Sequence, residues 1–99
     1  MSTIVYQGTI TTTGSTRIPC TSGRLLITSI IINNLTLPYS ITVSKFLNNG
    51  QSIPLYQFDL DAGDSVRDTE DYLLNTGDLI EILTDVAGGT YYVSAMTVS

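Results

Sequence analysis

Six carboxylates gather in one stretch of the sequence: Asp59, Asp61, Asp64, Asp68, Glu70 and Asp71. Ca²⁺ takes about six to eight oxygen ligands, and loop carboxylates supply many of them. Residues 61–64, however, lack the alternating ligand spacing of an EF-hand loop. Solvated acids at turns and strand ends are therefore the favoured interpretation, and a Ca²⁺ site over residues 59–71 stays open as the alternative.

A pair of these carboxylates could also act as the acid and base of a glycosidase. That chemistry needs a cleft, usually walled by aromatic side chains, and the chain has no Trp. The chain also has no His, so neither its Ser and Thr hydroxyls nor its single cysteine, Cys20, has an obvious activating base. We therefore expect no enzymatic activity, no catalytic residue, no metal site and no cofactor.

The charge balance excludes two classes of partner. Four Lys and Arg stand against nine Asp and Glu, which gives a net charge of −5. The cations are too few and too scattered to neutralise nucleic-acid phosphates or to bind an anionic membrane. Apolar runs such as residues 30–32 are too short to span a bilayer, and residues 1–3 show no signal-peptide pattern. We expect neither a nucleic-acid nor a membrane partner.

The single cysteine and the six tyrosines complete the list of notable side chains. A lone cysteine permits no internal disulfide, which suits a protein made in a reducing cytoplasm. Adjacent Tyr91 and Tyr92 must point to opposite faces of their strand, so one of them lies outside the core unless both faces are covered. Tyrosine is enriched at interfaces, but cross-strand packing on a sandwich surface explains it equally well, and both interpretations stay open.

Short β-rich runs alternate with turn residues along the whole chain, and no stretch has a helical period. This spacing predicts an all-β fold, an antiparallel β-sandwich of jelly-roll type with seven or eight short strands and no helix longer than about one turn. We expect a single domain over residues 1–99, with residues 1–13 as an N-terminal arm or an edge strand. The expected strands are 3–12, 16–20, 24–33, 39–47, 53–60, 79–84 and 90–98, with a short strand plus a loop over 65–74.

Three of these runs, residues 25–32, 53–60 and 79–83, are apolar at positions that belong to both faces of a strand. A sandwich has one inner face per sheet, so a domain this small cannot bury both faces of three strands by itself. Exposed apolar area of that kind marks contacts with other chains. The pattern predicts an assembly subunit.

Three segments carry a family resemblance: residues 22–34 (SGRLLITSIIINN), 60–64 (LDAGD) and 74–84 (LNTGDLIEILT). A long apolar strand ending in Asn, an "L-x-A-G-D" turn and a "GD-L-I-x-I" strand resemble small β-sandwich virion proteins of tailed bacteriophages. These are capsid decoration (cement) proteins and short modules of head fibres and tails. The resemblance implies a protein without enzymatic activity that forms homotrimers or sits on symmetry axes. It carries over no functional residue, because the matching positions are structural.

The leading hypothesis is therefore a structural protein of a phage virion, a capsid decoration protein that bridges capsid subunits. Its expected partners are the major capsid protein and further copies of itself, as a homotrimer. Its expected location is the virion, after synthesis in the host cytoplasm. The alternatives are a neck, tail or head-fibre component, and a small carbohydrate- or Ca²⁺-binding β-sandwich module.

Overall fold

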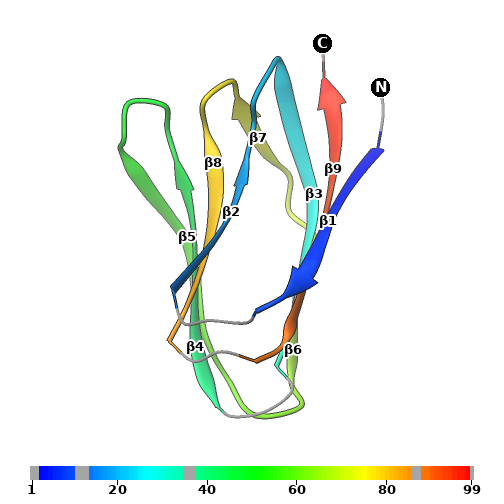
Figure 1. Ribbon diagram of the computed structural model, residues 1–99, viewed down its shortest axis with the longest axis vertical. Helices are drawn as coiled ribbons and strands as arrows, with labels where there is room; N and C mark the ends of the chain where they lie inside the picture. Colours follow the sequence, from blue (N-terminus) through cyan, green and yellow to red (C-terminus); the bar gives the residue numbers. More distant parts are fainter. Residues whose placement is uncertain (1–2, 11–13, 35–37, 86–87, 99) are drawn as a thin grey trace.

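The computed structural model describes residues 3–10, 14–34, 38–85 and 88–98, and these form two antiparallel β-sheets packed face to face (Figure 1). No described segment forms a helix able to cross a membrane. The strands are β1 (Thr3–Thr9), β2 (Gly14–Pro19), β3 (Arg24–Asn33), β4 (Tyr39–Phe46), β5 (Ser52–Leu60), β6 (Ser65–Asp68), β7 (Tyr72–Asn75), β8 (Leu79–Thr84) and β9 (Thr90–Val98).

The strand order is that of a jelly roll. One sheet has five strands in the order β1-β9-β3-β6, with β7 also paired to β3, and the other has four in the order β2-β8-β4-β5. The antiparallel pairs β1–β9, β2–β8, β3 with β6 and β7, and β4–β5 are nested in the sequence and alternate between the sheets. The predicted antiparallel β-sandwich is confirmed, although it has nine strands rather than seven or eight.

The additional strand comes from residues 65–74, where the sequence predicts a short strand plus a loop. Both β6 and β7 pair with β3, at its two ends, and together they act as one interrupted strand. Asp68 closes the interruption: its Oδ1 accepts the Glu70 N–H at 3.0 Å and its Oδ2 accepts the Tyr72 hydroxyl at 2.6 Å. A short Asp side chain is suited to such a turn because it bonds the backbone two residues on.

Side chains of both sheets fill one apolar core between them. Its buried members are Ile10, Ile18, Cys20, Leu25, Ile27, Ile30, Ile32, Ile41, Val43, Leu60, Leu74, Ile80, Ile82, Val93 and Ala95. On β3 the inward phase shifts at a bulge between Ile27 and Ser29, so that Ile30 follows Ile27 into the core. The core therefore buries only the inward apolar residues of β3. The outward apolar residues lie on the opposite face of the sheet.

Two buried polar side chains fix the turns at the ends of the sandwich. The Asn34 amide, 1% exposed, donates to the carbonyls of Leu60 (3.2 Å) and Asp61 (3.1 Å), which ties the β5–β6 turn to the end of β3. At the opposite ends of the strands, Asp78 is 3% exposed and accepts the N–H groups of Asn48 and Asn75, both at 3.0 Å. These side chains replace water for backbone groups that would otherwise be buried without partners.

The residues expected to form an N-terminal arm or edge strand are partly described. Residues 3–9 form β1, which lies at the edge of the five-stranded sheet and pairs only with β9. Its inward positions Ile4 and Tyr6 pack against the core. Residues 1, 2 and 11–13 of that stretch lie outside the described residues.

Replacing Asp78 with Ala tests the buried turn. The change leaves the Asn48 and Asn75 N–H groups without an acceptor, and an unsatisfied buried donor costs about 1–3 kcal/mol. We expect the free energy of unfolding, measured by urea denaturation, to fall by about 3 kcal/mol. The exposed control Asp61→Ala should change it by less than about 0.5 kcal/mol, and equal losses in the two variants would refute the role given to Asp78.

Gly77 and Gly50 form a matched pair that separates backbone strain from steric contact. Both have positive φ (93° and 90°), but a Cβ on Gly77 would lie 2.7 Å from the Asn48 Cβ, whereas one on Gly50 meets nothing within 4 Å. We expect Gly50→Ala to lower the free energy of unfolding by about 1 kcal/mol, from φ alone. Gly77→Ala should cost about 1–3 kcal/mol more. Equal melting temperatures of the two variants would show that the turn shifts to make room for the added Cβ, which would contradict the steric contact.

Candidate functional site

The six acids of residues 59–71 are spread over strands and the turns between them. No group of three or more His, Cys, Asp or Glu side chains in the part of the chain that is described lies close enough to hold an ion. Asp59 Oδ1 instead accepts the Ser40 hydroxyl at 2.6 Å, and the Asp64 N–H donates to the Asp61 carbonyl within a turn at 3.1 Å. Asp68 closes the β6–β7 interruption. These hydrogen bonds engage Asp59, Asp61 and Asp68 with groups of the chain itself.

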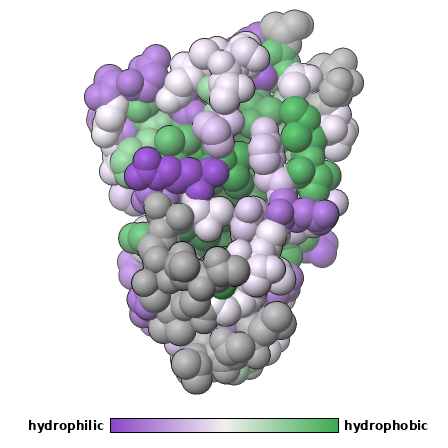
Figure 2. All heavy atoms as spheres, viewed as in Figure 1, coloured by the Kyte–Doolittle hydropathy of each residue, from purple (hydrophilic) through white to green (hydrophobic). Residues whose placement is uncertain are grey.

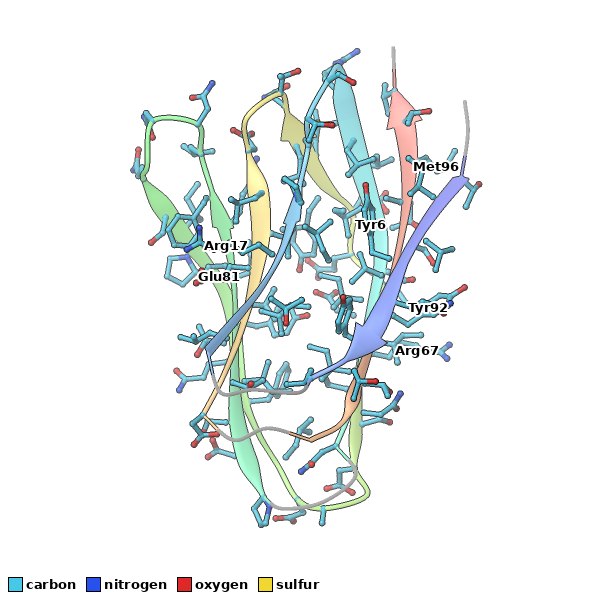
Figure 3. All side chains as sticks on the ribbon, viewed as in Figure 1. Tyr6, Arg17, Arg67, Glu81, Tyr92 and Met96 are labelled. Carbon is cyan, nitrogen blue, oxygen red and sulfur yellow. The ribbon has the colours of Figure 1, made fainter. Side chains whose placement is uncertain are left out.

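Cys20 and the tyrosines are placed mostly in or beside the core. The Cys20 thiol is buried and 3.7 Å from the carbonyls of Ser22 and Gly23. Tyr91 packs against the core, whereas Tyr92 points away from the sandwich and is 38% exposed (Figure 3). The sequence predicted these opposite directions. The side chain of Tyr39 lies outside what the structure describes.

The outward side of the five-stranded sheet carries an apolar patch, hereafter the outer patch, made of Val5, Leu26, Ile31, Leu73, Tyr92 and Met96. Strand pairing aligns Met96, Leu26 and Leu73 in one row, and Tyr92 beside Ile31 in another. Val5 and Leu73 are 42% and 38% exposed. Hydrophobic residues are visible over β1 and β9 at the right of Figure 2, on the side to which Tyr92 and Met96 point in Figure 3.

Charge is distributed unevenly between the two outer faces. No outward position of the described strands β1, β9, β3, β6 and β7 holds an Asp or Glu, although the chain has nine of these residues. On the four-stranded sheet, the Arg17–Glu81 ion pair (3.1 Å) lies across β2 and β8, and the Arg17 guanidinium lies 5.8 Å from the centre of the Phe46 ring. The outer face of the five-stranded sheet therefore has no acid at a described strand position, whereas that of the four-stranded sheet carries Glu81.

A hollow of about 220 Å³, hereafter the edge hollow, opens between the edge strand β5 and the interrupted strand β6–β7. Its lining is Leu55, Tyr56, Phe58, Val66, Arg67, Asp68, Glu70 and Tyr72. The Tyr56 and Phe58 rings are 5.3 Å apart and tilted by 58°. Sequence reasoning missed this site because its two walls come together only through the sheet order.

The tyrosines of the edge hollow sit in a negative, poorly solvated environment. Burial raises the pKa of Tyr56, and the Asp68 carboxylate raises that pKa further. Burial likewise raises the pKa of Tyr72, together with the hydrogen bond that its hydroxyl donates to Asp68. The Tyr56 hydroxyl is buried beside Asp68, but its geometry is too poor for a full hydrogen bond to that carboxylate or to another described group.

No protein-family model matches the sequence, and no curated protein matches it. Solved structures share the fold. The Drosophila NLP core, described for pentamer formation and histone binding, is 14% identical with a TM-score of 0.63, and the match covers 100% of both chains. A pentameric capsid protein from metagenomic phage sequences is 14% identical with a TM-score of 0.54, over 98% of this chain and 68% of that one.

Bacillus endospore appendages, described as disulfide-linked pili, match 99% of this chain and 87% of theirs, at 14% identity and a TM-score of 0.52. These likenesses show a shared fold. The β-sandwich that the resemblance implies is present, and a phage capsid protein is among the structures of similar fold, but no sequence family supports the resemblance itself. The differing descriptions of these structures assign no specific function to the chain.

Two tyrosine-to-phenylalanine changes test the contrast within the edge hollow. Tyr72→Phe removes a hydrogen bond to a carboxylate, and we expect it to lower the free energy of unfolding by about 1.5–3 kcal/mol. Tyr56→Phe removes a buried hydroxyl that makes no hydrogen bond of full geometry, so stability should be unchanged or slightly higher. Chemical denaturation measures both, and a larger loss for Tyr56→Phe would contradict the assignment.

Proposed function

We propose that the chain is a non-enzymatic structural protein of a phage virion, a capsid decoration protein that bridges neighbouring capsid subunits. The observation that carries this proposal is the outer patch. A monomer that worked alone would leave Val5, Leu73 and Tyr92 in water on an otherwise acidic molecule. Contiguous exposed apolar surface marks a contact with another chain.

The proposed occupant of the outer patch is a second copy of this chain. A copy with a net charge of −5 repels another copy, and that repulsion is smallest where the contacting faces carry no carboxylates. The outward positions of the five-stranded sheet meet this requirement, while the Arg17–Glu81 pair makes the other sheet a poorer self-contact. Tyr and Met, both present in the outer patch, are residue types enriched in protein interfaces.

The proposed oligomer is a homotrimer, as the resemblance to phage decoration proteins implies. Two proteins of similar fold are described as pentamers, one of them a phage capsid protein, which supports self-association through this architecture and makes a five-fold ring the alternative number. The proposed location is the virion, after synthesis in the host cytoplasm. The second contact of each subunit is with the major capsid protein; a neck, tail or head-fibre position would place the same oligomer on another virion component.

Co-sedimentation with assembled capsids, beside light scattering on the free protein, tests this function. We expect the protein to pellet with capsids at saturating stoichiometry and to form an oligomer, either in solution or on the shell. Pelleting with tails or necks but not with heads would select the alternative virion position. A chain that stays monomeric and pellets with no virion component would refute the proposal.

Two leucine-to-glutamate variants test the outer patch. Leu73 (38% exposed) lies in the patch and Leu83 (44% exposed) lies outward on the four-stranded sheet, so both changes add one charge at a similarly exposed site. We expect Leu73→Glu to weaken self-association at least about 10-fold, because it buries an unpaired charge in the contact. Leu83→Glu should leave it unchanged, and equal effects of the two variants would argue against the outer patch.

A further inference from the structure

The edge hollow combines aromatic and aliphatic walls with the acidic side chains of Asp68 and Glu70. Phe58 is 44% exposed although its strand position faces inward, and Leu55 and Val66 line the same space. Arg67 contributes to the rim, but its side chain points away from the sandwich (Figure 3). At about 220 Å³ the hollow is smaller than the roughly 300–1,000 Å³ of small-molecule pockets, which suits one side chain.

Two carboxylates, those of Asp68 and Glu70, supply hydrogen-bond acceptors in the edge hollow. Each oxygen of Asp68 accepts one hydrogen bond and keeps a lone pair for another. The buried Tyr56 hydroxyl lies beside Asp68 without a hydrogen bond of full geometry, and the exposed Glu70 adds a second carboxylate at the rim. A ligand that pairs with these oxygens must carry hydrogen-bond donors and a positive charge.

We propose that the edge hollow binds an arginine side chain presented by a neighbouring virion protein. Arginine has five N–H donors and no acceptor, so it matches a site whose free groups are carboxylates and a hydroxyl. Its planar guanidinium also stacks on aromatic faces such as that of Phe58. The inference rests on the proposed function only for the source of the arginine; the chemistry of the hollow stands by itself.

The electrostatic environment favours this cation over neutral ligands. The charge on Asp68 that raises the pKa of Tyr56 is the same charge that stabilises a guanidinium placed there. Partial burial strengthens the attraction, because the pair is less screened than one in open water. A sugar would gain from the ring faces but would leave the negative charge unpaired.

Titration with Nα-acetyl-L-arginine N-methylamide, followed by ¹H–¹⁵N NMR of the full chain, tests the inference. The citrulline analogue is the control, because it has nearly the same shape and no charge. We expect saturable shifts of the Asp68, Glu70 and Tyr72 amides with the arginine probe. Because hydrogen bonds to charged groups are the stronger ones, citrulline should bind about 10-fold more weakly or not at all.

Two variants locate the binding in the edge hollow. Glu70→Gln removes one carboxylate while keeping the backbone bond to Asp68, and Phe58→Leu removes the ring that the guanidinium stacks on. Each variant should lower the affinity for the arginine probe about 3- to 10-fold. Asp61→Asn makes the same change in net charge outside the lining and should leave the affinity unchanged.

Several results would overturn the inference: no saturable shift, equal binding of citrulline, an equal loss in Asp61→Asn, or stronger shifts with methyl glucoside than with the arginine probe. The test is independent of the proposed function. If the chain pellets with capsids but the arginine probe does not bind, only the edge hollow is wrongly assigned. If the probe binds and no virion component does, the hollow stands and the virion role fails.

Discussion

The rest of the structure depends on one geometric constraint: each sheet of a sandwich has a single inner face, and side chains alternate between the two sides of a strand. The core therefore accepts every second residue of an apolar strand and rejects the others. On β3 the bulge after Ile27 lets Ile30 and Ile32 join the core, but Leu26 and Ile31 remain on the outside. The outer patch consists of the apolar residues that this alternation keeps out of the core.

Apolar packing alone does not fix where the chain turns, and buried polar groups supply that information. Asn34 holds the β5–β6 turn at one end of the sandwich, and Asp78 holds the β7–β8 turn and the β4–β5 hairpin at the other. The Lys45 ammonium lies 4.0 Å from Asp78 and donates to the Leu73 carbonyl at 2.8 Å, so the same cluster also ties β4 to β7. Because these bonds link distant segments, they select one strand order among the many that alternation permits.

Period-two alternation and turn residues are local signals, and what depends on them could be predicted: the fold class, most strand positions and the opposite directions of Tyr91 and Tyr92. The split of residues 65–74 could not, because it depends on Asp68 bonding across the gap while β3 pairs on both sides of it. The buried role of Asp78 could not be predicted either, because the Asn48 N–H that it accepts belongs to a different turn. The sequence could not predict the edge hollow either, because residues 55–58 and 66–72 come together only when the two sheets pack.

The outer patch and the edge hollow differ in charge, so each suits a different kind of partner. The outer patch has no carboxylates, so like copies can approach there, whereas the edge hollow concentrates carboxylates and aromatic rings and is suited to a basic group that this chain scarcely has to offer, with four Lys and Arg in all. A self-contact and a contact with a different protein therefore call for different chemistry at different places on the same small sandwich. A protein that bridges subunits of a shell needs that separation, because a surface equally suited to both partners would let copies bind one another in place of the shell.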